Sequence, residues 1–182
     1  MHIKPVLFLD FDRTLFDTDQ FYVWLGENRF ERILKISSGE LTPPNFAEYL
    51  YSDTLEFLKT ASKTYRLVLL TYALNTVLQR KKVRGAGIIP LLDDVIMTQG
   101  NASGETGKGD AAHEYIKRIG DSGWEHAFVD DAPENIDEVK RKNPDIRCIR
   151  IDRTPLAQGA LHDGLLPPDL VVSSLRELTP VL

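Results

Sequence analysis

Short apolar runs separated by longer amphipathic stretches set the pattern of this chain. The first run, VLFL at 6–9, does not alternate with polar residues, which is typical of a central parallel strand covered on both faces. Further runs at 65–71, 93–98, 126–130, 146–151 and 170–172 are predicted to be strands as well. The chain therefore offers six candidate strands, of which the one at 93–98 has the weakest apolar pattern.

Helices are predicted between these strands. They cover 21–36, 45–64, 76–84, 110–119 and a segment that begins at Pro133. In the second stretch Ser52 and Asp53 offer an alternative start for a separate helix, and in the third Lys81, Lys82 and Arg84 suit the negative end of the helix dipole. Alternating strands and helices indicate βαβ units. We expect an α/β fold, one open parallel sheet between two helical layers, in a single domain over 1–182.

Composition and charge narrow the function classes. The net charge of −5 gives no general reason to bind nucleic acid or an anionic membrane. A single cysteine, Cys148, excludes an intrachain disulfide and a cysteine-based zinc site. The four histidines (His2, His113, His126, His162) lack metal-ligand spacing and are interpreted as surface or packing residues. The first apolar run is too short for a signal peptide or a membrane span, so we expect a soluble cytoplasmic protein.

Two aspartates follow the first apolar run directly. If the extended conformation continues past Asp10, the side chains of Asp10 and Asp12 point to the same face and share one small space. Ionised carboxylates in such a space repel each other and need a cation or a proton between them. This is the first indication of a divalent metal.

Other polar residues are predicted to reach the same crevice, because ligands of open parallel sheets bind beyond the carboxyl ends of the strands. Thr71, Asp130 and Asp131 stand at such ends, and Lys108 stands in the loop that follows the third strand. The glycine-rich segment around Lys108, GETGKGD at 104–110, does not complete the P-loop pattern GxxxxGK[ST]. Ala102 stands where the pattern requires glycine, and Gly109 stands where it requires Ser or Thr.

These residues together resemble the haloacid dehalogenase (HAD) superfamily of phosphohydrolases. DFDRT at 10–14 matches the first motif of that family, Thr71 the second, Lys108 the third and the pair Asp130 and Asp131 the fourth. The closing segment DLVVSSLREL is similar to the final strand and helix of the family. The resemblance implies a three-layer, Rossmann-like, HAD-like fold.

The resemblance also implies a division of roles, with which the chemistry of each residue type agrees. Asp10 would attack phosphorus to form an aspartyl-phosphate, and Asp12, which dehalogenating relatives lack, would act as general acid and base. Thr71 and Lys108 would bind the substrate phosphate. Mg²⁺, which prefers oxygen ligands, would be held by Asp10, Asp130, Asp131 and the backbone carbonyl of Asp12, and Asn135 would support the last motif.

The function predicted from the sequence is therefore Mg²⁺-dependent hydrolysis of phosphomonoesters. Two alternatives stay open: phosphotransfer to an acceptor other than water, as in mutases, and a non-catalytic module that binds phosphate or a partner. The oligomeric state is left open.

The space for a cap over the site is small. Only about 17–52 is free for an insert, which predicts a small helical lid, and the stretch between Thr71 and Lys108 has no room for a folded cap. We expect a fairly open site that takes a large phosphorylated substrate, or a small one enclosed by oligomerisation. Arg13 is interpreted as a salt-bridged loop residue, and Phe21, Tyr22 and Trp24 either line the site or pack inside the insert.

Overall fold

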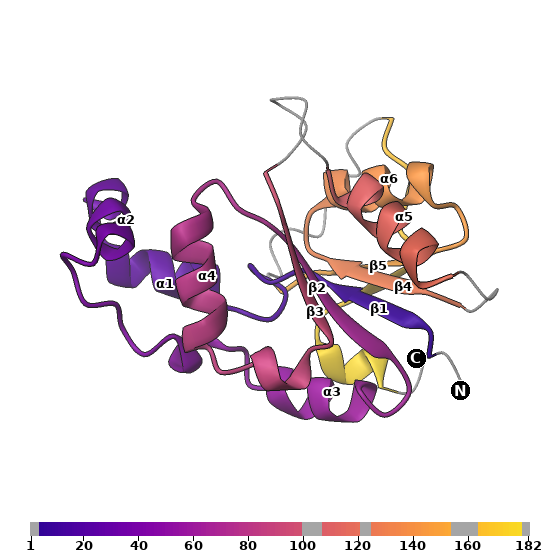
Figure 1. Ribbon diagram of the computed structural model, residues 1–182, viewed down its shortest axis with the longest axis horizontal. Coiled ribbons are helices and arrows are strands. Elements are labelled where there is room, and N and C mark those ends of the chain that lie inside the picture. The colour runs from indigo at the N-terminus through magenta and orange to yellow at the C-terminus, as the bar shows by residue number, and fades with distance from the viewer. Residues whose placement is uncertain (1–3, 100–106, 121–124, 154–163, 180–182) are drawn as a thin grey trace.

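The computed structural model describes residues 4–99, 107–120, 125–153 and 164–179. Six parallel strands form one sheet in the order β3-β2-β1-β4-β5-β6 (Figure 1). The strands are β1 (Val6–Leu9), β2 (Arg66–Tyr72), β3 (Asp94–Thr98), β4 (Ala127–Asp130), β5 (Arg147–Ile151) and β6 (Leu170–Val172). The α/β class and the parallel sheet predicted from the apolar runs are confirmed.

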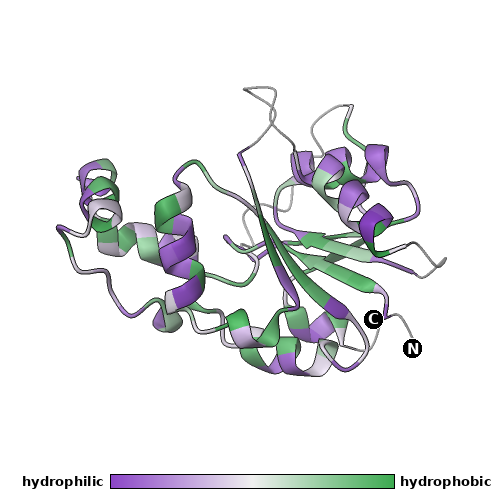
Figure 2. Cartoon of the chain, viewed as in Figure 1, coloured by the Kyte–Doolittle hydropathy of each residue, from purple (hydrophilic) through white to green (hydrophobic). Residues whose placement is uncertain are grey.

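Helices cover both faces of this sheet. The helices of the described residues are α1 (Thr18–Leu25), α2 (Arg29–Ser38), α3 (Thr54–Ala61), α4 (Thr76–Gly85), α5 (Lys108–Ile119) and α6 (Pro133–Lys142), with short 3₁₀ helices η1 (Phe46–Tyr49), η2 (Ile89–Leu91) and η5 (Leu175–Leu178). Of these, α1 and α2 lie beside the sheet, next to α4 (Figure 1). In Figure 1, α5 and α6 lie above the sheet and α3 and η5 below it. The strands are mostly hydrophobic, and hydrophilic residues gather on the helices (Figure 2).

Strand β1 shows why the sheet needs two covering layers. It lies between β2 and β4, and its four side chains are buried. Successive side chains point to opposite faces: Leu7 and Leu9 join the larger hydrophobic cluster, whereas Val6 and Phe8 join the cluster beneath α5 and α6. A strand buried on both faces has no position for a polar residue until it ends at Asp10.

The insert after β1 differs from the prediction. A single helix over 21–36 was predicted, but α1 and α2 are separate, because Gly26 has φ 66 and ends α1. The prediction of one helix over 45–64 is also wrong, because η1 is followed by a separate helix, α3. The alternative prediction, a separate helix that starts near Asp53, agrees with α3. The insert leaves and returns at neighbouring points, where the Asp17 amide donates to the Tyr49 carbonyl and the Tyr51 amide to the Leu15 carbonyl.

Two further predictions need correction. Lys108 was placed in a loop, but it is the first residue of α5, two residues before the predicted start. The closing helix is only the 3₁₀ helix η5, which begins with a capping box between Ser174 and Glu177. Residues of the P-loop-like segment at 100–106, with His2 and His162, lie outside the described residues. Among the described residues, no helix is long and apolar enough to cross a membrane.

Cys148 offers a test of the buried strand β5. Its thiol is fully buried, and burial followed by the nearby Asp169 carboxylate raises its pKa to about 12. Because the thiolate is the reactive form, we expect iodoacetamide to leave Cys148 unmodified in the native protein at neutral pH and to label it after unfolding in guanidinium chloride. Mass spectrometry of the labelled chain measures this. Fast labelling without denaturant would contradict the buried position.

Candidate active site

Asp10 lies at the carboxyl end of β1, in the middle of the sheet. Its backbone continues the strand, since the Asp10 amide donates to the Val129 carbonyl at 2.9 Å. Its side chain is buried, and burial, only partly opposed by the charge of Lys108 and reinforced by Asp130, raises the pKa of this carboxyl well above its ordinary value. The Asp10 carboxylate thus lies where a cation would stabilise its charged form.

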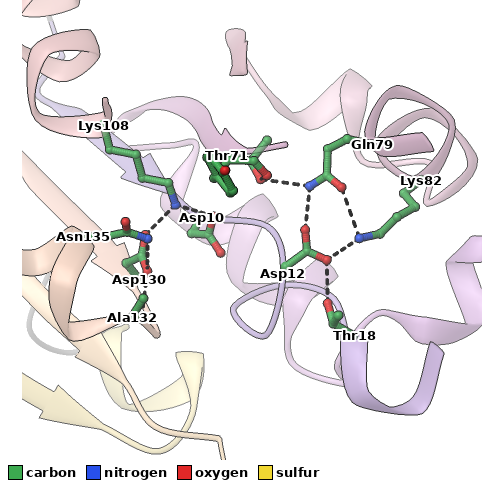
Figure 3. A network of polar contacts seen from close by, with 11 residues as sticks. Asp10, Asp12, Thr18, Thr71, Gln79, Lys82, Lys108, Asp130, Ala132 and Asn135 are labelled. Carbon is green, nitrogen blue, oxygen red and sulfur yellow. Dashed lines mark hydrogen bonds and ion pairs between the residues drawn. The ribbon is translucent and has the colours of Figure 1, made fainter. Parts of the chain in front are cut away.

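Lys108 joins Asp10 to the fourth motif. Its Nζ lies 2.6 Å from Asp10 Oδ1 and 2.6 Å from Asp130 Oδ2, and all three side chains are buried (Figure 3). Burial alone would lower the pKa of Lys108, but the two carboxylates outweigh it and raise this pKa. A buried cation between two carboxylates is placed to neutralise a phosphoryl group at the same point.

Gly109 lets Lys108 reach this position. A Cβ at Gly109 would lie 2.8 Å from the Glu138 carbonyl oxygen, so α5 packs closely on α6 only because the residue is glycine. The Gly109 amide donates to Glu138 Oε1 at 2.9 Å, and Asn143 Nδ2 donates to the Gly109 carbonyl at 2.9 Å. Sequence reasoning missed Gly109 because a close approach between two helices leaves no local pattern.

Asp130, in the fourth motif, accepts hydrogen bonds from residues at the start of α6. Asp130 Oδ1 accepts from the Ala132 amide at 2.8 Å, and Asn135 Nδ2 donates to Asp130 Oδ1 at 3.0 Å and to Oδ2 at 3.1 Å. Asn135 was predicted to support this loop, and it lies in the first turns of α6, which begins at Pro133 as predicted. Both Asp130 oxygens therefore have donors, and the carboxylate is fixed in orientation.

Three carboxylates form a candidate metal site. One oxygen each from Asp10, Asp130 and Asp131 lies within 4.8 Å of the other two. Burial, followed by the charge of Asp130, raises the pKa of Asp131 to about 7. Carboxylate oxygens are the ligands that Mg²⁺ prefers, and a cation would stabilise the charged forms of Asp10 and Asp131, which burial and the neighbouring Asp130 disfavour. The donor set fits Mg²⁺.

Asp12 has a cation partner of its own. Its Oδ1 accepts from Thr18 Oγ1 at 2.5 Å and forms an ion pair with Lys82, and its Oδ2 accepts from Gln79 Nε2 at 2.6 Å (Figure 3). Burial opposes ionisation of Asp12, but the Lys82 charge and these hydrogen bonds lower its pKa below the ordinary value. Asp10 and Asp12 line one cavity, as the sequence predicted, yet each has a separate lysine.

Lys82 and Gln79 were missed from the sequence. Lys82 is buried on α4, and its Nζ lies 4.8 Å from the ring centre of Phe16 and 5.3 Å from that of Phe11. The available signal was its place in the apolar stripe of α4, four residues after Leu78 and four before Ala86. A lysine on an apolar stripe needs a buried anion, and here that anion is Asp12.

Thr71 is hydrogen-bonded to this second group. Its Oγ1 is buried and accepts from Gln79 Nε2 at 2.9 Å, so Gln79 bridges Thr71 and Asp12 (Figure 3). The Thr71 side chain does not line the cavity that contains Asp10 and Asp12. Its role in binding phosphate stays a prediction.

A cavity of about 530 Å³ connects these residues with the insert. Phe21 and Tyr22 line it, whereas Trp24 packs against Phe21 and Arg32. Arg13 lies at the cavity with φ 58, a conformation that favours glycine, and forms an ion pair with Asp19 at 2.8 Å. His126 is buried and accepts from the Val6 amide at 3.0 Å, a packing role.

Comparison with known proteins rests on structure. No family model matches the chain, and no curated protein matches it by sequence. A haloacid dehalogenase-like hydrolase of Burkholderia xenovorans LB400 superposes with a TM-score of 0.73 at 15% identity, covering 98% of this chain and 96% of the other. The HAD-hydrolase YfnB of Bacillus subtilis, solved with bound magnesium, gives 0.69 at 12% identity, covering 100% and 99%.

The chain has the haloacid dehalogenase-like fold. A HAD phosphatase of Thermococcus onnurineus has a TM-score of 0.66 at 17% identity and covers 97% of each chain. Dehalogenases are among the similar structures too, including an L-2-haloacid dehalogenase of Xanthobacter autotrophicus. The fold is thus that of HAD-like hydrolases, and the reaction has to be argued from the residues of the site.

Proposed function

We propose that this protein is a Mg²⁺-dependent phosphatase that hydrolyses phosphomonoesters through an aspartyl-phosphate on Asp10. The observation that carries the proposal is the arrangement around Asp10: a buried carboxylate with the Lys108 ammonium at 2.6 Å, two further carboxylates within metal-binding distance, and Asp12 in the same cavity. The magnesium bound to a similar structure, YfnB, supports the choice of metal.

The residues divide the reaction into two steps. In the first, an Asp10 oxygen attacks phosphorus and the bond to the ester oxygen breaks, while Asp12, which takes up a proton when the anionic substrate binds, passes this proton to the leaving alcohol. In the second, Asp12 takes a proton from water, which attacks the aspartyl-phosphate and releases phosphate with Asp10 restored. Lys108 neutralises phosphoryl oxygens in both steps. Mg²⁺, held by Asp10, Asp130, Asp131 and the Asp12 carbonyl, would add positive charge at the same oxygens.

Asp12 favours a phosphatase over a dehalogenase. Displacement of a halide needs no proton, whereas an alkoxide leaving group does. The carboxylate of Asp12 is held by Lys82, Gln79 and Thr18 inside the cavity, next to the nucleophile. These partners hold the carboxylate next to the nucleophile, which supports a role of Asp12 in proton transfer.

Metal removal tests the proposal. We expect the purified protein to release phosphate from an aryl phosphate with Mg²⁺, to lose this activity in EDTA, and to recover it when Mg²⁺ is restored in excess. Mg²⁺ should also raise the melting temperature of EDTA-treated protein, because it binds the folded state alone. Full activity in EDTA would refute the proposal. Chloride release from 2-chloropropionate without any phosphatase activity would favour a dehalogenase.

A further inference from the structure

The cavity above Asp10 and Asp12 has one apolar wall. The residues on that wall come from the insert, from the segment between β2 and α4, and from α4 itself: Tyr22, Phe30, Ile33, Leu34, Leu74 and Leu78. The floor carries the charged residues Asp10, Asp12, Lys108 and Asp131. The two surfaces therefore suit a ligand with an anionic end and an apolar end.

Several large apolar side chains on this wall are exposed together. Leu74 is 90% exposed, Phe30 74% and Leu34 50%. Scattered exposed apolar residues are ordinary, but a group of them around one cavity marks a binding surface. The cavity volume of about 530 Å³ falls in the range of small-molecule sites, so a compact ligand is sufficient to cover the wall.

The geometry of attack directs the leaving group toward this wall. In an in-line displacement the leaving oxygen departs on the side of phosphorus opposite to the nucleophile. Asp12, the proton donor for that oxygen, lies between Asp10 and α4 in Figure 3. A substituent on the leaving oxygen therefore extends past Asp12 toward α4 and the insert.

The wall is held in place by contacts with α4. Asn75 Nδ2 donates to Ser37 Oγ at 3.0 Å, and Lys81 Nζ donates to the Ile36 carbonyl at 2.5 Å and to the Ser37 carbonyl at 3.2 Å. These bonds connect the end of α2 to α4, so the apolar side chains of α2 are positioned before a ligand arrives. Preorganisation of this kind favours a defined ligand shape.

Polar groups on the wall are few, and most are already engaged. Asn75 is used by Ser37 and by the Leu78 amide, and Arg13 by Asp19. Among the described residues that line the cavity, Arg13 Nη1 and the hydroxyls of Tyr22 and Tyr72 remain as side-chain donors. A leaving group with many hydroxyls finds few partners among the apolar side chains of the wall, which disfavours its binding relative to an apolar group.

We propose that the preferred substrates are phosphomonoesters of compact, uncharged, apolar or aromatic alcohols, with the alcohol held against Phe30, Ile33, Leu34 and Leu74. This inference rests on the proposed phosphatase function and specifies its substrate class. It gives the small insert a role, because its helix α2 supplies three of the six wall residues.

A matched pair of esters tests the substrate class. Cyclohexylmethyl phosphate and glucose 6-phosphate both carry a primary ester on a six-membered ring, and they differ in the ring oxygen and the hydroxyls of glucose. We expect kcat/KM to be at least about tenfold higher for cyclohexylmethyl phosphate. Equal values, or a preference for glucose 6-phosphate, would overturn the inference.

Substitutions on the wall test whether its side chains cause this preference. Leu34→Asn and Phe30→Ala should each lower kcat/KM for cyclohexylmethyl phosphate by roughly tenfold, and should lower it much less for acetyl phosphate, whose leaving group is too small to reach the wall. Val23→Ala is the matched control, because Val23 is an exposed apolar residue of the insert that does not line the cavity. It should change neither rate.

The outcomes separate the two proposals. If acetyl phosphate is hydrolysed with Mg²⁺ but the wall variants do not affect the apolar ester, the phosphatase function stands and the substrate class is wrong. If neither acetyl phosphate nor any ester is hydrolysed, both proposals are wrong. All substituted residues are partly or largely exposed, so loss of folding does not confuse the result, and circular dichroism verifies it.

Discussion

Replacing Asp10 by asparagine is expected to lower phosphate release by at least about 10³-fold. The amide is nearly the same shape as the carboxylate but is not a nucleophile, so the covalent step fails. Asp10 is buried at the end of β1 with Lys108 at 2.6 Å, and an asparagine oxygen can still accept that hydrogen bond. Steady-state release of phosphate from an aryl ester with Mg²⁺ measures the effect.

The same substitution should not destabilise the fold. Burial and the neighbouring carboxylates raise the pKa of Asp10, which means that folding penalises its charge. For an acid with a raised folded-state pKa, this penalty is absent below the unfolded pKa and grows as the pH rises through the folded one. In EDTA at neutral pH the melting temperature of Asp10→Asn should therefore equal or exceed that of the wild type, and the two should converge in acid.

Asp137→Asn is the matched control for this experiment. Asp137 lies on α6 outside the candidate site, where its carboxylate accepts from Arg141 and from the Leu166 amide. It should keep wild-type turnover. Turnover by Asp10→Asn at the wild-type rate would exclude Asp10 as nucleophile, and a fall in its melting temperature in EDTA would show that Lys108 needs the Asp10 charge.

The sequence predicted the sheet well because buried parallel strands have a strong local signal. The unbroken apolar run from Val6 to Leu9 favours a strand buried on both faces, and the residues at the ends of β1, β2 and β4 follow from strand polarity. Helix boundaries were less accurate. The break at Gly26 depends on a single backbone conformation, and the start of α5 at Lys108 depends on Gly109 packing against α6.

The second lysine of the site could not be predicted in this way. Lys82 in the last turn of a helix had a sufficient explanation in the helix dipole. Its burial depends on Phe11, Phe16 and Phe21, which lie near one another only after the insert has folded. The predicted site lacked Lys82 because its contacts are with residues distant in sequence, and such contacts leave no periodic pattern.

The role of Asp53 also depends on residues distant in sequence, and its substitution is expected to have a large effect on stability. It was interpreted as a helix cap, and it does precede α3, but its side chain makes no capping bond. Instead, Asp53 Oδ2 accepts from Arg153 Nη1 at 2.8 Å and from the Leu175 amide at 2.9 Å, and Oδ1 accepts from Arg153 Nη2 at 3.0 Å. Arg153 also donates to the Thr14 carbonyl at 2.8 Å. This buried pair therefore connects the loop after β1, α3 and η5.

We expect Asp53→Ala to lower the free energy of unfolding by about 3–5 kcal/mol, because it leaves the Arg153 charge buried without its partner and the Leu175 amide unsatisfied. Denaturant unfolding monitored by circular dichroism measures this change. Glu31→Ala, which breaks the exposed pair with Lys35 on α2, is the control and should shift stability by less than about 1 kcal/mol.

A double variant distinguishes an unpaired charge from a simple loss of contacts. In Asp53→Asn with Arg153→Met the buried charge is gone, while the asparagine oxygen can still accept from the Leu175 amide. Replacing a whole buried ion pair costs much less than removing one partner, so this double variant should be more stable than Asp53→Ala although it changes two residues. A double variant less stable than Asp53→Ala would mean that the hydrogen bond from Arg153 to the Thr14 carbonyl dominates, and that the loop after Asp10 and Asp12 depends on the arginine itself.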